Sequence, residues 1–145
     1  MAPVDKYPPL VTARSPSYQR ARDELAKPSP PGDAAVVALV GRLVEAEHEA
    51  ARATRAAGLA DAAAEHGARA QALGELISAL GGSAPRPEES RDILTHGADA
   101  VARGPDPVAE LRAMREELDA LYADAARDPQ LTAEQRRAIE ALAPG

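Results

Sequence analysis

Apolar residues recur every three or four positions along most of the chain, a spacing that predicts amphipathic helices. The two longest stretches cover residues 33–57 and 60–80. Gly58 separates them and suits the left-handed backbone that follows a helix end, while Asp33 is a suitable N-cap for the first helix. Helices joined by so short a link pack antiparallel and bury their apolar faces together. The residues expected on these faces are Val36, Leu39, Val40, Leu43, Ala50, Thr54 and Ala57, then Leu59, Ala62, Leu73, Leu76, Ile77 and Leu80.

Three more helices are predicted in the second half, at residues 88–103, 106–127 and 132–143. The first of these should cross the bundle. The second has the most regular apolar stripe, with Asp106 as its cap and Pro107 at its first position. Thr132 and Gln135 resemble a capping box that opens the last helix. Because that helix has only about three turns, we expect it to leave apolar surface uncovered on its neighbours.

Residues 1–32 form a separate N-terminal arm, which holds more than half of the thirteen prolines, ahead of a bundle at 33–145. The pattern predicts extended, polyproline-like chain near its start and one short helix at 16–26. Two interpretations remain open: a disordered tail, or a strap that docks on its own bundle or on a partner. The expected anchors of such a strap are Tyr7, Leu10, Val11, Tyr18 and Leu25.

The composition favours an all-α protein that does not bind nucleic acid. Aromatic residues make up 2% of the chain, Trp and Phe do not occur, and the formal net charge is -6. Few aromatics leave no platform for stacked bases, and the acidic balance disfavours a phosphate backbone. The chain has no cysteine, which excludes disulfides and thiolate ligands. No apolar run is long enough for a signal peptide or a membrane span, so we expect a cytoplasmic protein.

The order of short motifs along residues 35–142 resembles that of ferritin-like four-helix bundles of an uncharacterised bacterial family. The matching motifs are Leu43-Val44-Glu45, Ala56-Ala57, Glu75-Leu76, Leu80-Gly81-Gly82, Leu94-Thr95-His96-Gly97 and Leu121-Tyr122-Ala123-Asp124. The resemblance implies a ferritin-like antiparallel bundle and no particular activity. This chain departs from that pattern at its end, where the fourth helix should be about twice as long.

A ferritin-like fold raises the question of a di-iron centre, which takes inward-facing Glu and Glu-x-x-His residues from several helices. The candidate ligands are Glu47, His48, Glu65 and His66. The angular positions of these residues around their helix axes place Glu47 and His66 on the inner faces. His48 points about 120° away from the centre of the apolar face. We estimate that Glu47 lies about 9 Å further along the bundle than His66. We therefore expect no shared metal ion and no cofactor, with iron as the alternative.

The simpler interpretation of Glu47 is structural. Arg69 lies on the inner side of the second helix at a similar height, so we expect a buried Glu47–Arg69 ion pair, with Arg115 beside it. His96 lies in the connector, residues 85–104, and is expected at its surface. The acidic runs 45–49 and 116–117 are expected to face solvent apart from Glu47.

No nucleophile elbow or phosphate-binding glycine loop is present, so the leading hypothesis is a non-enzymatic protein. We expect it to act by association, either as a homo-oligomer or as an accessory subunit docked through residues 1–32. The alternative is a metal-binding, ferritin-like protein. A third possibility is that the arm delivers the bundle to a larger assembly as an address peptide.

Overall fold

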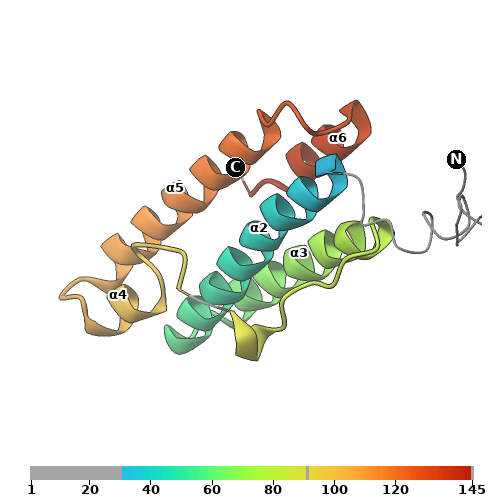
Figure 1. Cartoon of the computed structure of the whole chain (residues 1–145). Coiled ribbons are helices and arrows are strands. Elements are labelled where there is room, and N and C mark those ends of the chain that lie inside the picture. The colour runs from blue at the N-terminus through green and yellow to red at the C-terminus, as the bar shows by residue number, and fades with distance from the viewer. Residues whose placement is uncertain (1–30, 91, 145) are drawn as a thin grey trace, which may run out of the picture.

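The computed structural model describes residues 31–90 and 92–144, and over these residues it is all-helical, without a β-strand. The predicted docking anchors of the N-terminal arm lie outside the described residues. Five α-helices make up the described part of the chain, and they pack together (Figure 1). The elements are α2 (Pro31–Ala56), α3 (Ala60–Ala79), the 3-10 helix η1 (Pro87–Glu89), α4 (Ala98–Arg103), α5 (Pro107–Ala126) and α6 (Ala133–Leu142).

Helix α2 is the centre of the molecule. It contacts α3, α4, α5 and η1, with α3 on one side of it and α5 on the other (Figure 1). Val44, Ala46 and Ala53 are buried in addition to the expected face, because α4 and α5 cover a second side of this helix. The largest fully buried apolar or aromatic side chains contributed by the other helices are Tyr122, Leu73, Ile77, Leu118 and Ile139.

The turn between α2 and α3 forms as predicted, with two corrections nearby. Gly58 has φ of +80°, and the Leu59 amide donates to the Thr54 carbonyl at 2.8 Å, which closes the end of α2. Ala57, expected in the core, is exposed at this turn. Leu59, expected on the inner face, remains 46% exposed because it precedes the first residue of α3. Asp33 lies in the first turn of α2, which begins two residues before it, and is not its cap.

The predicted helix at 88–103 is wrong over most of its length. The chain has one turn of 3-10 helix at η1 and irregular backbone before α4, which has only six residues. Glu49 explains part of this path: it is only 2% exposed, and its Oε1 accepts hydrogen bonds from the amides of Ile93 (2.8 Å) and Leu94 (2.9 Å). The expectation that Glu49 faces solvent is therefore wrong, because a buried carboxylate replaces the acceptors that a helix would have supplied.

A second carboxylate holds the same connector from α5. Glu117, also expected in solvent, is half-buried and accepts from the amides of Thr95 (2.7 Å) and His96 (3.0 Å). The His96 ring is partly exposed, as expected, and its Nδ1 lies 2.9 Å from Glu110 Oε1. Four consecutive amides thus bond to acidic side chains on helices that lie on either side of the connector.

Helices α5 and α6 begin at the predicted signals. Asp106 accepts from the Ala109 amide at 3.2 Å, and Pro107 is the first residue of α5. Thr132 and Gln135 form the expected capping box, each side chain accepting from the other's backbone amide. Helix α6 has ten residues and packs on α5. Helices α3 and α5 each contact α2 far more than they contact each other. The short α6 does not cover the full length of the space between them.

The described helices include none that combines the length and the apolar composition needed to cross a bilayer.

We predict that Gly97→Ala destabilises the fold. A Cβ atom at Gly97 would lie 1.7 Å from Glu49 Oε2, so the carboxylate must move and release the connector amides. Leaving such buried groups without partners costs about 1–3 kcal/mol. The matched control is Gly67→Ala in the middle of α3, where an added Cβ meets nothing within 4 Å. That change should stabilise the protein by about 0.5–1 kcal/mol.

Urea unfolding of both variants provides the test. Opposite signs for the two alanines are expected. A Gly97→Ala variant as stable as the wild type would show that Glu49 does not need the space beside Gly97.

The hydrogen bond to Glu110 raises the pKa of the His96 imidazole above its usual 6.5. Because the folded-state pKa is the higher one, this pair stabilises the fold fully below about pH 6.5 and less as the pH rises through the folded pKa. We predict that Glu110→Gln lowers the His96 pKa measured by NMR titration. Glu116→Gln, an exposed change on the same helix, should leave it unaltered.

Candidate functional site

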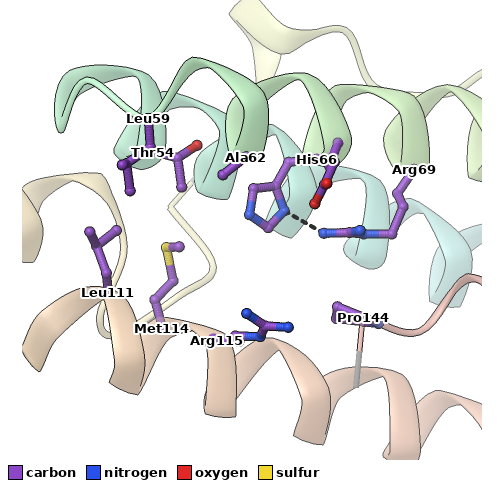
Figure 2. Close-up of a pocket in the computed structure, with 10 residues that line it drawn as sticks. Thr54, Leu59, Ala62, His66, Arg69, Leu111, Met114, Arg115 and Pro144 are labelled. Carbon is purple, nitrogen blue, oxygen red and sulfur yellow. Dashed lines mark hydrogen bonds between the residues drawn. The ribbon is translucent and has the colours of Figure 1, made fainter. Parts of the chain in front are cut away.

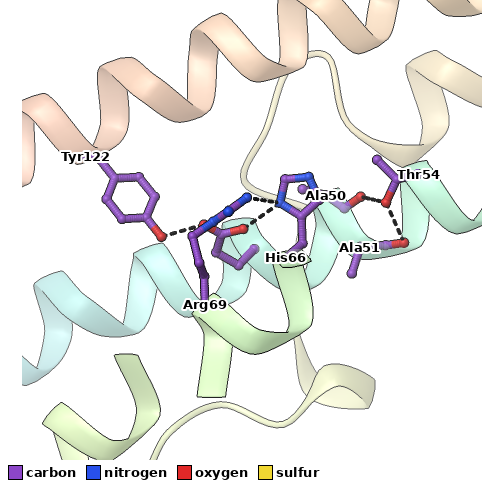
Figure 3. Close-up of polar contacts among 7 residues, drawn as sticks. Ala50, Ala51, Thr54, His66, Arg69 and Tyr122 are labelled. Atoms are coloured by element: carbon purple, nitrogen blue, oxygen red, sulfur yellow. Dashed lines mark hydrogen bonds and ion pairs between the residues drawn. The ribbon is translucent and has the colours of Figure 1, made fainter. Parts of the chain in front are cut away.

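Four polar side chains from three helices meet in the interior (Figure 3). Glu47 of α2 is fully buried, and His66 and Arg69 reach it from α3. His66 Nδ1 lies 2.7 Å from Glu47 Oε1, and Arg69 Nε lies 2.9 Å from Oε2. The Tyr122 hydroxyl, from α5, also donates to Glu47 Oε2. The predicted Glu47–Arg69 pair is confirmed as the centre of a larger polar cluster.

The arrangement around Glu47 determines the tautomer of His66. Glu47 Oε2 accepts from Arg69 and Tyr122, so Oε1 requires the remaining donor, which is Nδ1–H of His66. Arg69 Nη2 also approaches this Nδ1, at 2.9 Å, but a protonated Nδ1 cannot accept from it. The second ring nitrogen, Nε2, is therefore left for a partner outside the cluster.

Tyr122 completes the cluster and was missed as a functional residue. Burial, followed by the negative charge of Glu47, raises the pKa of its phenol above the usual value of about 10. The hydroxyl therefore stays protonated and acts as a donor to the carboxylate. The available signal was its place in the apolar stripe of residues 106–127, because a buried tyrosine hydroxyl needs a partner.

The expected separation of Glu47 and His66 is wrong. They lie eleven and eight residues from Gly58, so the offset along the helix axes is about 4.5 Å rather than 9 Å. Two long side chains span this offset, and the carboxylate meets the imidazole directly. The cluster therefore includes the histidine that was expected to lie apart from it.

Two members of the cluster, His66 and Arg69, line one wall of a cavity of about 190 Å³ between α3 and α5. Figure 2 shows the rings and chains of His66, Leu111, Met114 and Arg115 directed toward this space from facing helices. Arg115, expected beside Glu47, is exposed and lines the cavity from α5. The full lining is Thr54, Leu59, Ala62, Glu65, His66, Arg69, Leu111, Met114, Arg115 and Pro144.

The chemistry that this arrangement offers is binding and proton exchange. A carboxylate that orients an imidazole toward a cavity is the arrangement of a general base. The hydroxyl of the lining belongs to Thr54, whose Oγ1 donates toward the Ala50 and Ala51 carbonyls at 2.8 and 3.1 Å (Figure 3). That hydroxyl is not directed at His66, so no nucleophile–base pair results.

The four alternative metal ligands do not come together. Glu47 and His66 are in contact, but Arg69 and Tyr122 already occupy the second oxygen of Glu47. Glu65 is exposed at the cavity, and His48 Nε2 lies 3.2 Å from the Pro85 carbonyl on another face. Within residues 31–90 and 92–144, no three His, Asp or Glu side chains form a group that could hold a metal ion. A guanidinium in contact with the carboxylate also repels a cation, so the cluster does not fit iron.

We predict that Glu47→Gln destabilises the protein by about 3 kcal/mol. This is the lower end of the range for removing one member of a buried ion pair, because Arg69 retains some access to water. Tyr122→Phe removes a donor to a charged group and should cost about 1.5–3 kcal/mol. Glu65→Gln, an exposed change on α3, is the control and should have little effect.

Urea unfolding of the single and double variants measures the coupling. Tyr122→Phe should cost less in the Glu47→Gln background, since the charged acceptor is already lost. Additive free energies of unfolding would contradict the contact between the two residues.

Comparisons of the chain with protein-family models, with curated proteins and with solved structures found no match.

Proposed function

We propose that this protein is a non-enzymatic, ferritin-like helical bundle that self-associates. The cavity between α3 and α5, called the groove below, receives the N-terminal arm of a second copy. The observation that carries the proposal is this groove. Leu59, Leu111 and Met114 line it, and Leu59 is one of only two large apolar residues exposed in the described part of the chain. An antiparallel four-helix bundle would cover this space with a full-length fourth helix, and α6 is too short to do so.

The arm has the length and the side chains to fill such a groove. Thirty residues precede α2, and an extended chain of that length reaches about 100 Å, well beyond the roughly 39 Å of α2 itself. Tyr7, Leu10, Val11, Tyr18 and Leu25 supply large apolar groups in a segment otherwise rich in proline and charge. Exchange of an identical segment between copies is a low-cost route to an oligomer.

Light scattering of the full chain tests the proposal. Leu59→Asp places a charge in the groove, and Asp suits this N-cap position of α3, so the fold should be retained. The matched control is Val108→Asp, because Val108 is 66% exposed on α5 and does not line the cavity. We expect a wild-type oligomer that Leu59→Asp converts to a monomer and Val108→Asp leaves intact.

Circular dichroism should show the same helicity in all three proteins. A wild type that is monomeric at every concentration, or a Leu59→Asp variant that still associates, would refute self-association through the groove.

A further inference from the structure

The imidazole of His66 presents an unused hydrogen-bond acceptor to the groove. With Nδ1–H donated to Glu47, Nε2 of the neutral ring carries a lone pair and no proton. Over the part of the chain that the structure describes, the hydrogen bonds of this ring all involve Nδ1. His66 lines the groove and is only 9% exposed. An occupant that fills the groove and excludes water must therefore bring a donor for Nε2.

The rest of the lining favours an uncharged occupant with an apolar body. Glu65 and Arg115 both line the groove and carry opposite charges. Arg69 is already paired with Glu47, so neither an anion nor a cation would meet an excess of opposite charge. The remaining lining is mostly apolar and includes Leu59, Ala62, Leu111, Met114 and Pro144.

The volume of the groove is close to that of a single aromatic ring. Apolar cavities of about 150 Å³ take up a benzene molecule, and the groove has about 190 Å³. A phenol joins such a ring to one O–H donor, so it matches the volume, the apolar lining and the free acceptor together.

We propose that Tyr18 of a second copy inserts its phenol ring into this groove and donates its hydroxyl hydrogen to Nε2 of His66. The chain contains three tyrosines and neither Trp nor Phe. Tyr122 is buried in the core, so the other two aromatic hydroxyls both belong to the N-terminal arm. This inference rests on the proposed function, because it specifies how the arm of one copy occupies the groove of another.

The spacing of apolar residues along the arm selects Tyr18. Leu25 follows it by seven residues, and the short helix predicted for this segment places both side chains on one face, about 10 Å apart. Leu59, the cap residue of α3, precedes His66 by the same seven residues. In an arm helix antiparallel to α3, Tyr18 beside His66 therefore brings Leu25 beside Leu59. Tyr7 is followed directly by two prolines, which do not continue such a helix.

Sedimentation equilibrium of full-length variants tests the assignment. Tyr18→Ala removes the ring and the hydroxyl, and should weaken self-association about thirtyfold or more, the loss typical of an interface anchor. Tyr18→Phe keeps the ring and leaves Nε2 without its donor, which should weaken association about threefold to tenfold. Tyr7→Ala and Tyr7→Phe are the matched controls and should leave the association constant unchanged.

The ¹⁵N resonance of His66 Nε2 reports the hydrogen bond itself. At a concentration at which both proteins associate, this resonance should lie further upfield in the wild type than in Tyr18→Phe, because phenylalanine brings no donor. The ring nitrogens of His48 and His96 should stay in place.

Equal effects of the Tyr18 and Tyr7 substitutions, or an Nε2 resonance that Tyr18→Phe does not move, would overturn the insertion of Tyr18. If Leu59→Asp still yields a monomer in that case, self-association through the groove stands without it. A wild type that is monomeric at every concentration would refute both.

Discussion

The burial of the Glu47 carboxylate constrains the whole helical arrangement. A charge without solvent is tolerated only when donors surround it, and here the donors come from His66 and Arg69 on α3 and from Tyr122 on α5. All three helices must therefore be in register for the charge to be satisfied. Many of the buried apolar residues are alanines, whose small side chains interlock little, so the polar cluster adds a directional constraint on the register of these helices.

The same logic extends to acids that bond to the main chain. Glu49 and Glu117 accept from four successive connector amides, and these bonds replace the ladder of a helix. The acidic character of the chain is thus partly structural. Glu49 and Glu117 each belong to an acidic run of the kind usually found at a protein surface. Here they act as fixed acceptors for residues 93–96, which form no helix.

Much of the helical framework was predictable, because its signals are local. Gly58 at the turn, Asp106 with Pro107 at the start of α5, and the capping box of α6 each lie within a few residues of the boundary that they determine. The Glu47–Arg69 pair also followed from helical angles and heights. These features depend on short-range geometry, which the periodicity of a single sequence contains.

The features that were missed depend on distant partners. The connector was expected to be helical because its composition allows a helix. Its amides bond instead to Glu49, which is 44 and 45 residues before the two donors, and to Glu117, which is 22 and 21 residues after the next two. The contact between Glu47 and Tyr122 joins positions 75 residues apart. Neither separation leaves a trace in local periodicity, so the tertiary fold decides both.

The connector also has a consequence for the order in which the chain acquires its structure. Contacts between α2 and α3 are close in sequence and can form early, since closing a short loop loses little chain entropy. Residues 93 and 94 gain their acceptor only when the connector docks on α2, 44 and 45 residues away, and residues 95 and 96 gain theirs from α5, so the segment is complete only when it contacts both helices. We accordingly expect this segment to order later than the α2–α3 hairpin, and its amides to exchange with deuterium sooner than those in the middle of α2.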